Sequence, residues 1–431
     1  MNDIRRVTVV GCGTIGLPCA VAFASRGGRV TGIDIDRERI SRLSQGDIGR
    51  SDARLAQGLE AAIAAKTIAF GSSIDRASEP TAFVIAVQTP VDAEGNPEWR
   101  FLRAAADVVF ASAQPGDLVI LRSTVPVGAT RRLADAARTR GLEIHVAACP
   151  DRSVSGDSFR EQFTVPTIVG GVDAASARAA GELFGRLGPV VVVASAETAE
   201  AVKLFCNVQR DIQFAAANQF ALACERLDLD FEEIRRAGAH EYPRFSLARP
   251  GPVGGDCLPK DGFLLAAALG GARDALPLAL SARRLNQSLV DFVAAAICRR
   301  VEAVAPRPAK VAILGIAFKG EPATADQRHS FGVALAEVLK SRLQGVEIST
   351  WDPVLSSGAG VEAAVGAADA VVLANDHPTL GAIDLDRMAA LLRTGALIYD
   401  ACGRDGSGSA RLANDVTFRS FGRRFASLEA V

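Results

Sequence analysis

A cysteine stands in the glycine- and proline-rich stretch GPVGGDCLPKD, which runs over residues 251–261. The glycines let a backbone approach a ligand closely, and Lys260 and Asp261 place charges near the Cys257 thiol. Beside a bound dinucleotide, such a thiol could hold an aldehyde, formed from an alcohol by loss of a first hydride, as a thiohemiacetal. Loss of a second hydride would then leave a thioester for water to cleave. Without that context a lone cysteine is more often inert. The role of Cys257 therefore depends on the rest of the chain.

A lysine and an asparagine form a second candidate site on a predicted helix. Residues 197–227 contain no Gly or Pro and repeat apolar residues at spacings of three and four, which predicts one long helix. Lys203 and Asn207 are four residues apart and so share one face of it. An ammonium and an amide directed at one point would suit an oxyanion. Alternatively, both side chains face solvent, as charged helical residues usually do.

A glycine turn precedes both candidates. The sequence GCGTIG at 11–16 follows the apolar run VTVV and opens a helical pattern, and the next predicted strand ends at Asp34. Such glycines permit a tight turn and close approach to a pyrophosphate at the helix N-terminus. Asp34 would accept from ribose hydroxyls and repel a 2′-phosphate, which favours NAD over NADP, although Arg37 and Arg39 lie close enough to soften that preference. A glycine turn that only packs helix on strand is the alternative.

Two further polar turns, QTP at 88–90 and STVP at 123–126, follow later predicted strands. Ligands of parallel sheets bind beyond the carboxyl ends of the strands. We therefore expect both turns to contact the nicotinamide half of the cofactor, although turn chemistry alone would also explain them.

Three blocks must position these residues. Over 1–195 short apolar runs alternate with helical patterns, which predicts a parallel sheet with helices on both faces. Two long helical runs dominate 196–305, and the strand and helix alternation returns over 306–431. We predict an α/β protein with two Rossmann-like doubly wound parallel-sheet domains joined by a central helical domain. The central domain would carry the catalytic residues and a dimer interface, unless its helices pack only within one subunit.

Composition excludes several function classes. The 431 residues include 48 basic and 49 acidic side chains, so no broad basic field would attract nucleic acid or an anionic membrane. No apolar run approaches the ~20 residues of a membrane helix, and the apolar start is too short for a signal peptide. The eight cysteines form no CxxC pair, which favours reduced thiols and indicates no metal site. We therefore expect a cytoplasmic protein.

The motifs GCGTIG, STVPVG, AEAVKLFCN, PGPVGGDCLPKD and LGIAFKG…DQRHS, in this order, resemble those of the nucleotide-sugar 6-dehydrogenase family, of which UDP-glucose dehydrogenase is a member. The resemblance covers nearly the whole chain. It implies a homodimer that uses NAD to oxidise the C6 hydroxymethyl group of a UDP-sugar to a carboxylate in a four-electron reaction. The first domain would bind NAD and the third would bind the UDP-sugar.

The resemblance also implies roles for individual residues. Cys257 would form the thioester, Lys203 and Asn207 would stabilise the oxyanion, Asp261 would assist water or base steps, and Thr124 would lie near the nicotinamide and the catalytic water. The cofactor-binding positions would be Gly11, Gly13, Thr14, Ile15, Gly16, Asp34, Arg39, Gln88, Thr89, Ser123, Thr124 and Arg328. The substrate-binding positions would be Arg152, Lys203, Asn207, Arg244, Gly254, Gly255, Phe318, Lys319 and Arg404, with Arg244 contributed across the dimer.

The chain departs from the family pattern in two places. Asp151 in CPDR stands where the family has a catalytic glutamate, so the carboxylate is one methylene shorter, and the cysteine loop is about one residue shorter than in its relatives. An Arg-Asp pair like Arg210 and Asp211 is typical of the family branch that acts on UDP-N-acetylhexosamines. We therefore prefer UDP-GlcNAc or UDP-ManNAc as the substrate. CLPKD is closer to the UDP-glucose branch, and GDP-mannose is a third option.

Two other classes of function remain open from the sequence. If the replacement of glutamate by Asp151 has destroyed catalysis, the protein would be a regulator that binds a nucleotide sugar or NAD without turning it over. A two-electron dehydrogenase would stop at an aldehyde or act on a hydroxy acid, although such enzymes lack the cysteine loop. The number of NADH formed per substrate separates these possibilities.

Overall fold

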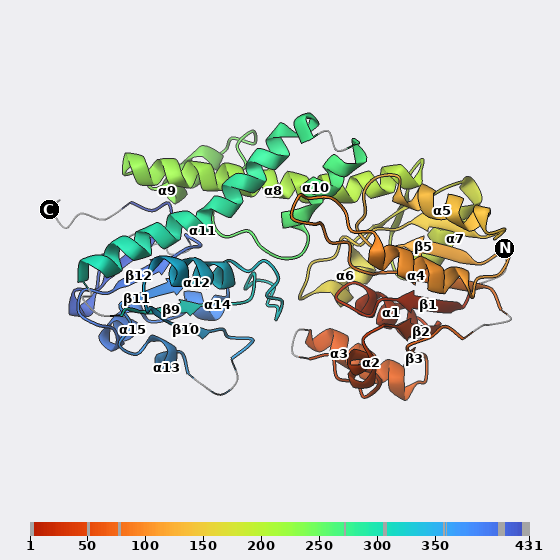
Figure 1. The fold of residues 1–431 in the computed structure, drawn as a ribbon, viewed down its shortest axis with the longest axis horizontal. Coiled ribbons are helices and arrows are strands. Elements are labelled where there is room, and N and C mark those ends of the chain that lie inside the picture. The colour runs from red at the N-terminus through yellow and green to blue at the C-terminus, as the bar shows by residue number, and fades with distance from the viewer. Residues whose placement is uncertain are drawn as a thin grey trace. The chain divides into compact units, whose positions relative to one another are not determined.

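A computed structural model describes residues 4–49, 52–75, 79–270, 273–304, 308–356, 358, 360–403 and 410–424 (Figure 1). The chain divides into two compact units. Unit 1 comprises Met1–Asn207 with Lys260–Leu276, and unit 2 comprises Val208–Pro259 with Pro277–Val431. The three domain boundaries expected from the sequence stay a prediction.

Unit 1 is built on an eight-stranded sheet in the order β3-β2-β1-β4-β5-β6-β7-β8. The order reverses beside β1, which pairs with β2 on one side and β4 on the other, and such a reversal is where open α/β sheets bind ligands. The pairs are parallel except β6 with β7, which is antiparallel. The strands are β1 (Arg6–Val10), β2 (Arg29–Ile33), β3 (Ile68–Gly71), β4 (Thr81–Ile85), β5 (Leu118–Leu121), β6 (His145–Ala148), β7 (Thr167–Gly171) and β8 (Val190–Val192).

Helices cover both faces of this sheet (Figure 1). Strand β5 shows the alternation, because Leu118 and Ile120 join the core beneath α1, α3 and α7, whereas Val119 and Leu121 join the core beneath α4 and α5. The helices are α1 (Gly16–Ser25), α2 (Arg37–Ser44), α3 (Ala53–Ala64), α4 (Arg100–Phe110), α5 (Ala129–Thr139), α6 (Ser158–Thr164) and α7 (Ala174–Phe184).

The central helices follow the expected pattern. The long helix predicted over 197–227 is confirmed as α8 (Ala196–Leu227), and its first turn packs on β6 and β7 through Ala196 and Ala199. The second long helix is α11 (Pro277–Val304), and the proline at its first position suits a helix N-terminus. Between them lie α9 (Phe231–Ala239), α10 (Leu258–Ala268) and a short 3₁₀ turn, η1 (Arg273–Ala275).

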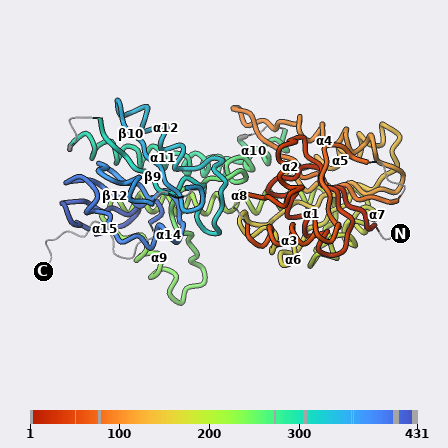
Figure 2. Tube along the Cα trace, turned by 90° about the horizontal axis from the view of Figure 1, so that it is seen from below, coloured from red at the N-terminus to blue at the C-terminus, as the bar shows by residue number. Residues whose placement is uncertain are grey.

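Unit 2 contains a six-stranded sheet in the order β10-β9-β11-β12-β14-β13, parallel except for β13. Helix α11 packs along α12 on one face (Figures 1 and 2), and α13 to α15 cover the other. The strands are β9 (Lys310–Leu314), β10 (Glu347–Trp351), β11 (Ala370–Leu373), β12 (Leu397–Asp400), β13 (Ala410–Arg411) and β14 (Thr417–Ser420). The remaining helices are α12 (Phe331–Arg342), α13 (Val361–Val365), α14 (Pro378–Gly381), α15 (Leu385–Leu391) and the 3₁₀ turn η2 (Ala413–Asp415).

The predicted fold class is therefore confirmed: two α/β parallel-sheet domains with a central helical region. Across the described ranges, no helix combines the length and apolar character that a membrane crossing requires.

Candidate active site

The glycine turn after β1 has the geometry of a dinucleotide cradle. Gly11 has φ +94°, and a Cβ on Gly16 would lie 1.8 Å from the Gly11 carbonyl oxygen, so neither position accepts a side chain without distortion. A Cβ on Gly13 would meet nothing within 4 Å. Two glycines thus close the turn, and the third leaves open the space that a pyrophosphate would fill. Thr14 is exposed and Ile15 is half-buried at the start of α1.

Asp34 is tied to this turn by its carboxylate. Oδ2 accepts from the Cys12 amide at 2.9 Å and from Arg39 Nη1 at 3.2 Å, and Oδ1 accepts from the Asp36 amide at 3.0 Å. Each carboxylate oxygen can accept two hydrogen bonds, so Oδ1 keeps capacity for a ribose hydroxyl. Arg39 pairs with both Asp34 and Asp36, which balances its charge. These residues fit NAD, whose ribose carries a hydroxyl where NADP carries a phosphate.

The turns after β4 and β5 are bonded to each other. Ser123 Oγ donates to the Val87 carbonyl at 2.6 Å, and Thr89 Oγ1 donates to the Thr124 carbonyl. Thr89, Ser123 and Thr124 are buried, whereas Gln88 is exposed. The expected cofactor residues other than Arg328 thus lie in unit 1, beyond the carboxyl ends of β1, β2, β4 and β5.

Lys203 and Asn207 are both buried on α8, with 7% and 6% of their surfaces exposed, so the solvent-facing alternative is wrong. Asn207 Nδ2 donates to Asp261 Oδ2 at 2.6 Å, and Lys260 Nζ donates to Asp261 Oδ1 at 2.9 Å. Lys260 Nζ also lies 3.5 Å from Thr89 Oγ1. A buried polar chain therefore connects the cofactor turn, α10 and α8.

Lys260 was not among the expected site residues. Its signal in the sequence was its place beside Asp261 in LPKD, which we interpreted only as a charge near the thiol. The helical register of α10 instead buries Lys260 between Asp261 and Thr89. In this position its ammonium offsets the charge of a carboxylate that has no exposed surface.

Asp151 lies in a second buried network. Oδ1 accepts from Arg122 Nη2 at 2.7 Å and Gln162 Nε2 at 3.1 Å, and Oδ2 accepts from the Ser153 amide and hydroxyl at 3.2 and 2.6 Å. Burial alone would raise the pKa of Asp151, but Arg122, Ser153, the nearby charge of Lys203 and Gln162 together hold that pKa below its ordinary value. The carboxylate is therefore a fixed negative charge and a weak proton acceptor.

Arg122 and Gln162 were also missed, because nothing near them in sequence marks them. The Arg122 guanidinium lies 4.9 Å from the Phe184 ring centre and donates to the Cys149 carbonyl at 3.0 Å. Arg152, an expected substrate contact, donates to the Pro166 carbonyl at 2.6 Å within unit 1.

The cysteine loop belongs to unit 2, where it packs on the segment after β9. A Cβ on Gly254 would lie 2.4 Å from the His329 carbonyl oxygen, and one on Gly255, where φ is +86°, would lie 2.8 Å from the Phe318 ring. The Gly255 amide donates to the Arg328 carbonyl at 3.0 Å. The close approach expected of these glycines is thus made to the protein itself, which fixes the loop that carries Cys257.

Charged groups surround this loop within unit 2. Arg328 pairs with Asp256, next to Cys257, at 3.1 Å and with Asp326 at 2.6 Å. Lys319 Nζ lies 5.6 Å from the centre of the Phe318 ring. Cys257 is half-buried and directly precedes α10. Several predicted substrate residues, Gly254, Gly255, Phe318 and Lys319, are therefore brought together with Arg328.

A polar network holds the start of the loop. Asn218 bonds both backbone groups of Gly251, through Oδ1 at 2.7 Å and Nδ2 at 3.0 Å, and also bonds Asn286 at 2.9 Å. Asn286 and Arg283 in turn donate to Asp211. Burial raises the pKa of Asp211 despite the opposing charge of Arg283. Of the Arg210 and Asp211 pair, only Asp211 enters this network, since Arg210 is exposed.

The remaining expected residues have other surroundings. Arg244 is exposed, 4.7 Å from the Tyr242 ring centre, and donates to the Tyr242 hydroxyl at 3.2 Å. Arg404 lies outside the described residues. Within the parts of the chain that the structure describes, no group of three or more His, Cys, Asp or Glu side chains could hold a metal ion.

Three domains of one family match the sequence. The UDP-glucose/GDP-mannose dehydrogenase family matches through its NAD binding domain at residues 5–188, its central domain at 197–288 and its UDP binding domain at 312–404. The predicted NAD cofactor and the family resemblance are thereby confirmed.

Similar proteins agree with this match. UDP-N-acetyl-D-mannosamine dehydrogenase of Pyrococcus horikoshii is 32% identical over 403 residues, which cover 90% of this chain and 93% of that protein. NDP-N-acetyl-D-galactosaminuronic acid dehydrogenase of Ralstonia nicotianae is 32% identical over 422 residues, which cover 90% of this chain and 94% of that protein. A solved structure of UDP-D-ManNAc dehydrogenase from Pyrococcus horikoshii superposes with a TM-score of 0.87 at 30% identity and covers 97% of this chain and 99% of that one. The chain therefore belongs to the UDP-glucose/GDP-mannose dehydrogenase family and is an NAD-dependent oxidoreductase of nucleotide sugars.

Proposed function

We propose that the protein oxidises the C6 hydroxymethyl group of a UDP-N-acetylhexosamine to a carboxylate, with two NAD⁺ reduced for each sugar. The observation that carries the proposal is the buried chain Thr89–Lys260–Asp261–Asn207, which joins the cofactor turn to the helix of Lys203. The similarity to dehydrogenases named for N-acetylated sugars supports the choice of substrate.

Cys257 is the proposed nucleophile. It is half-buried and directly precedes α10, whose N-terminus is the positive end of the helix. In the first oxidation C6 loses a hydride and its hydroxyl loses a proton, which gives the aldehyde. Bound NAD⁺ would supply the oxidant, with one NAD⁺ for each of the two hydrides lost from C6. The thiolate adds to the aldehyde from the first oxidation, and the C–S bond forms as the carbonyl oxygen takes a proton. Loss of hydride and that proton gives the thioester. Water then adds, and the C–S bond breaks to return the thiolate and release the carboxylate.

The chain's polar groups stabilise these steps. Lys203 and the remaining amide hydrogen of Asn207 are proposed to bind the carbonyl oxygen as it becomes negative, inside a buried site where such bonds are strong. We assign Asp261 to assisting the water or base steps, as the family resemblance implies, since Lys260 and Asn207 hold its two oxygens in place. Asp151, with its lowered pKa and four hydrogen bonds, contributes a fixed negative charge near Lys203.

We also propose a cytoplasmic homodimer that forms along α8 and α9. Large apolar side chains on these helices are exposed, among them Phe220 at 50%, Leu227 at 67% and Ile234 at 42%. Exposed apolar patches of this kind mark association surfaces.

Arg244, exposed beside Tyr242, would reach the partner's substrate. Mixing inactive Arg244→Ala and Cys257→Ser proteins should then restore activity in heterodimers, whereas no recovery would place Arg244 in its own subunit's site.

A substrate panel tests the proposal. UDP-ManNAc, UDP-GlcNAc, UDP-glucose and GDP-mannose are each incubated with NAD⁺, and mass spectrometry identifies the products. The expected product is an N-acetylated uronate. Formation of UDP-glucuronate alone would assign the protein to the UDP-glucose branch of the family. Binding of a sugar without reduction of NAD⁺ would instead indicate a regulator.

Cys257→Ser should abolish net turnover, and full activity of that variant would remove Cys257 from the mechanism.

A further inference from the structure

We propose that Glu200 is a positioning residue that fixes α8, and with it Lys203, against the cofactor turn at 123–128. The inference rests on the proposed function of Lys203. Glu200 Oε2 accepts from the Gly128 amide at 2.6 Å, and Oε1 accepts from the Thr130 amide at 2.7 Å and the Thr130 hydroxyl at 2.6 Å. Both side chains are buried, with 3% of Glu200 and none of Thr130 exposed.

Helix α5 depends on this carboxylate for its N-terminal cap. The N-cap residue is Gly128, at φ +92°, which has no side chain to accept from the first amides, and the first turn contains no acidic residue. Helices leave their first amides unpaired unless a cap accepts from them. An acidic group at this end also interacts favourably with the helix dipole. In this protein the cap comes from α8, 70 residues further along the chain.

Glu200 shares one helix face with the residues of the site. Lys203 follows it by three residues and Asn207 by seven, and these spacings place the three on one side of α8. All three are buried. Because the same face carries the cap and the proposed oxyanion groups, the bonds to Gly128 and Thr130 fix how far along its axis α8 lies relative to α5.

The turn between β5 and α5 is held at both ends. At its start, Ser123 bonds the Val87 carbonyl and Thr89 bonds the Thr124 carbonyl. At its end, the Gly128 amide bonds Glu200. Loss of the Glu200 carboxylate would leave Thr124 anchored at one end only.

The carboxylate is held at an energetic cost. Burial raises the pKa of Glu200 above its ordinary value, and the bonds from Thr130 and Gly128 oppose that rise only in part. These donors are two amides and one hydroxyl, without a formal charge.

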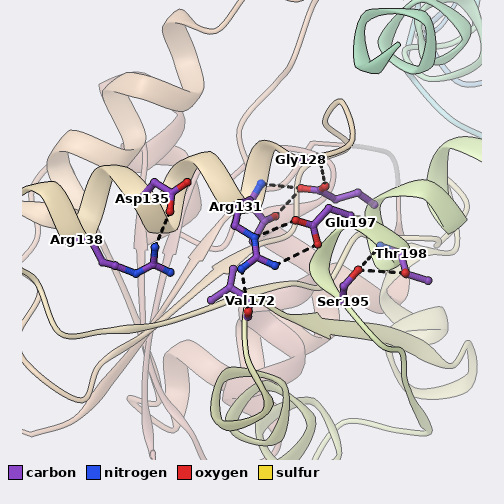
Figure 3. A network of polar contacts seen from close by, with 10 residues as sticks. Gly128, Arg131, Asp135, Arg138, Val172, Ser195, Glu197 and Thr198 are labelled. Atoms are coloured by element: carbon purple, nitrogen blue, oxygen red, sulfur yellow. Dashed lines mark hydrogen bonds and ion pairs between the residues drawn. The ribbon is translucent and has the colours of Figure 1, made fainter. Parts of the chain in front are cut away.

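A neighbouring pair supplies the matched control. Arg131 of α5 donates to Glu197 of α8 at 3.0 Å and to the Val172 carbonyl at 3.0 Å (Figure 3). Glu197 lies one turn before Glu200 and joins the same two helices, but about a third of its side chain is exposed and it contacts no amide of the turn. Glu197→Gln therefore perturbs the contact between α5 and α8 while it removes no hydrogen bond of the cap; it also removes a negative charge that raises the pKa of Glu200.

The test compares Glu200→Gln with Glu197→Gln. In Glu200→Gln the side-chain carbonyl can still accept from Thr130, but the new amide group would face the Gly128 amide, donor against donor. We expect kcat to fall by about 10- to 100-fold, as for ~1 Å misplacements in active sites, with a smaller change in KM for the UDP-sugar. Glu197→Gln should stay within about twofold of wild type, since exposed ion pairs contribute little. Assays run well below both melting temperatures, so that loss of folding does not lower kcat.

Two further measurements keep the inference separate from the proposed function. Hydrogen exchange at the Gly128 and Thr130 amides should accelerate in Glu200→Gln and not in Glu197→Gln. Faster exchange with kcat equal to that of Glu197→Gln would make Glu200 a purely structural cap and overturn the inference. If the wild type turns over no sugar, the proposed function fails, and the affinity of each variant for NAD⁺ is then measured by titration. Weaker NAD⁺ binding by Glu200→Gln alone supports a role of Glu200 in positioning the cofactor turn. Equal NAD⁺ binding by both variants refutes that role.

Discussion

Replacing Arg122 with methionine should lower the free energy of unfolding of unit 1 by about 3–5 kcal/mol, the usual cost of removing one partner from a buried ion pair. The Arg122 and Asp151 side chains are 4% and 5% exposed, and Nη2 lies 2.7 Å from Oδ1. Without the guanidinium, the carboxylate keeps Ser153 and Gln162 but loses its directly bonded cation. Methionine can still pack on Phe184, so little of the loss would come from a cavity.

The pH dependence of this effect has a definite sign. The pKa of Asp151 is lowered in the folded protein, so its ionisation stabilises the native state above its ordinary pKa, and that stability is lost as pH falls through the folded value. Removing Arg122 should raise this pKa. The stability difference between wild type and Arg122→Met should therefore be full at neutral pH and shrink as pH falls through the raised pKa of Asp151 in the variant.

The chain offers a local probe for the measurement. Its two tryptophans are Trp99 in unit 1 and Trp351 in unit 2, so in a Trp351→Phe background the fluorescence reports unit 1 alone during urea unfolding. The double variant Arg122→Met/Asp151→Asn removes the uncompensated charge and should be more stable than Arg122→Met. A loss under about 1 kcal/mol, typical of surface pairs, or no recovery in the double variant, would refute the buried-pair reasoning.

Two further predictions concern the thiols and the glycine turn. Iodoacetamide in mildly alkaline buffer should modify the half-buried Cys257, while Cys19 and Cys149 stay protected because burial raises their pKa values to about 11 and about 12. Peptide mass spectrometry measures this, and equal labelling of Cys149 would contradict it. Gly13→Ala should keep its melting temperature yet bind NAD⁺ more weakly, because its Cβ enters open space, whereas Gly16→Ala should melt earlier, because its Cβ would lie 1.8 Å from a carbonyl oxygen. Similar melting temperatures for the two variants would show that the turn adapts.

Local patterns in the sequence predicted much of the fold. The absence of Gly and Pro over 197–227 predicted α8, and the glycine turn followed by Asp34 predicted the first β-α-β unit, because both signals lie within short segments. The antiparallel pairing of β6 and β7 was not predicted, since a strand pattern does not encode direction.

The site was predictable only where single residues carry a local signal. Lys203, Asn207 and Asp261 each carry a local signal in the sequence, but that signal does not reveal how deeply all three are buried. Arg122 and Gln162 meet Asp151 from 29 and 11 residues away. Glu200 meets Thr130 from 70 residues away. Contacts at such separations are created by packing of the folded chain, and no spacing rule reveals them.

The central claim is a four-electron oxidation, and the yield of NADH per UDP-sugar consumed tests it most directly. The measurement follows NADH by absorbance to the end of the reaction and counts the remaining UDP-sugar by chromatography. Two NADH for each sugar, with a uronate as product, is the predicted result. One NADH for each sugar, with an aldehyde as product, would contradict the thioester route through Cys257.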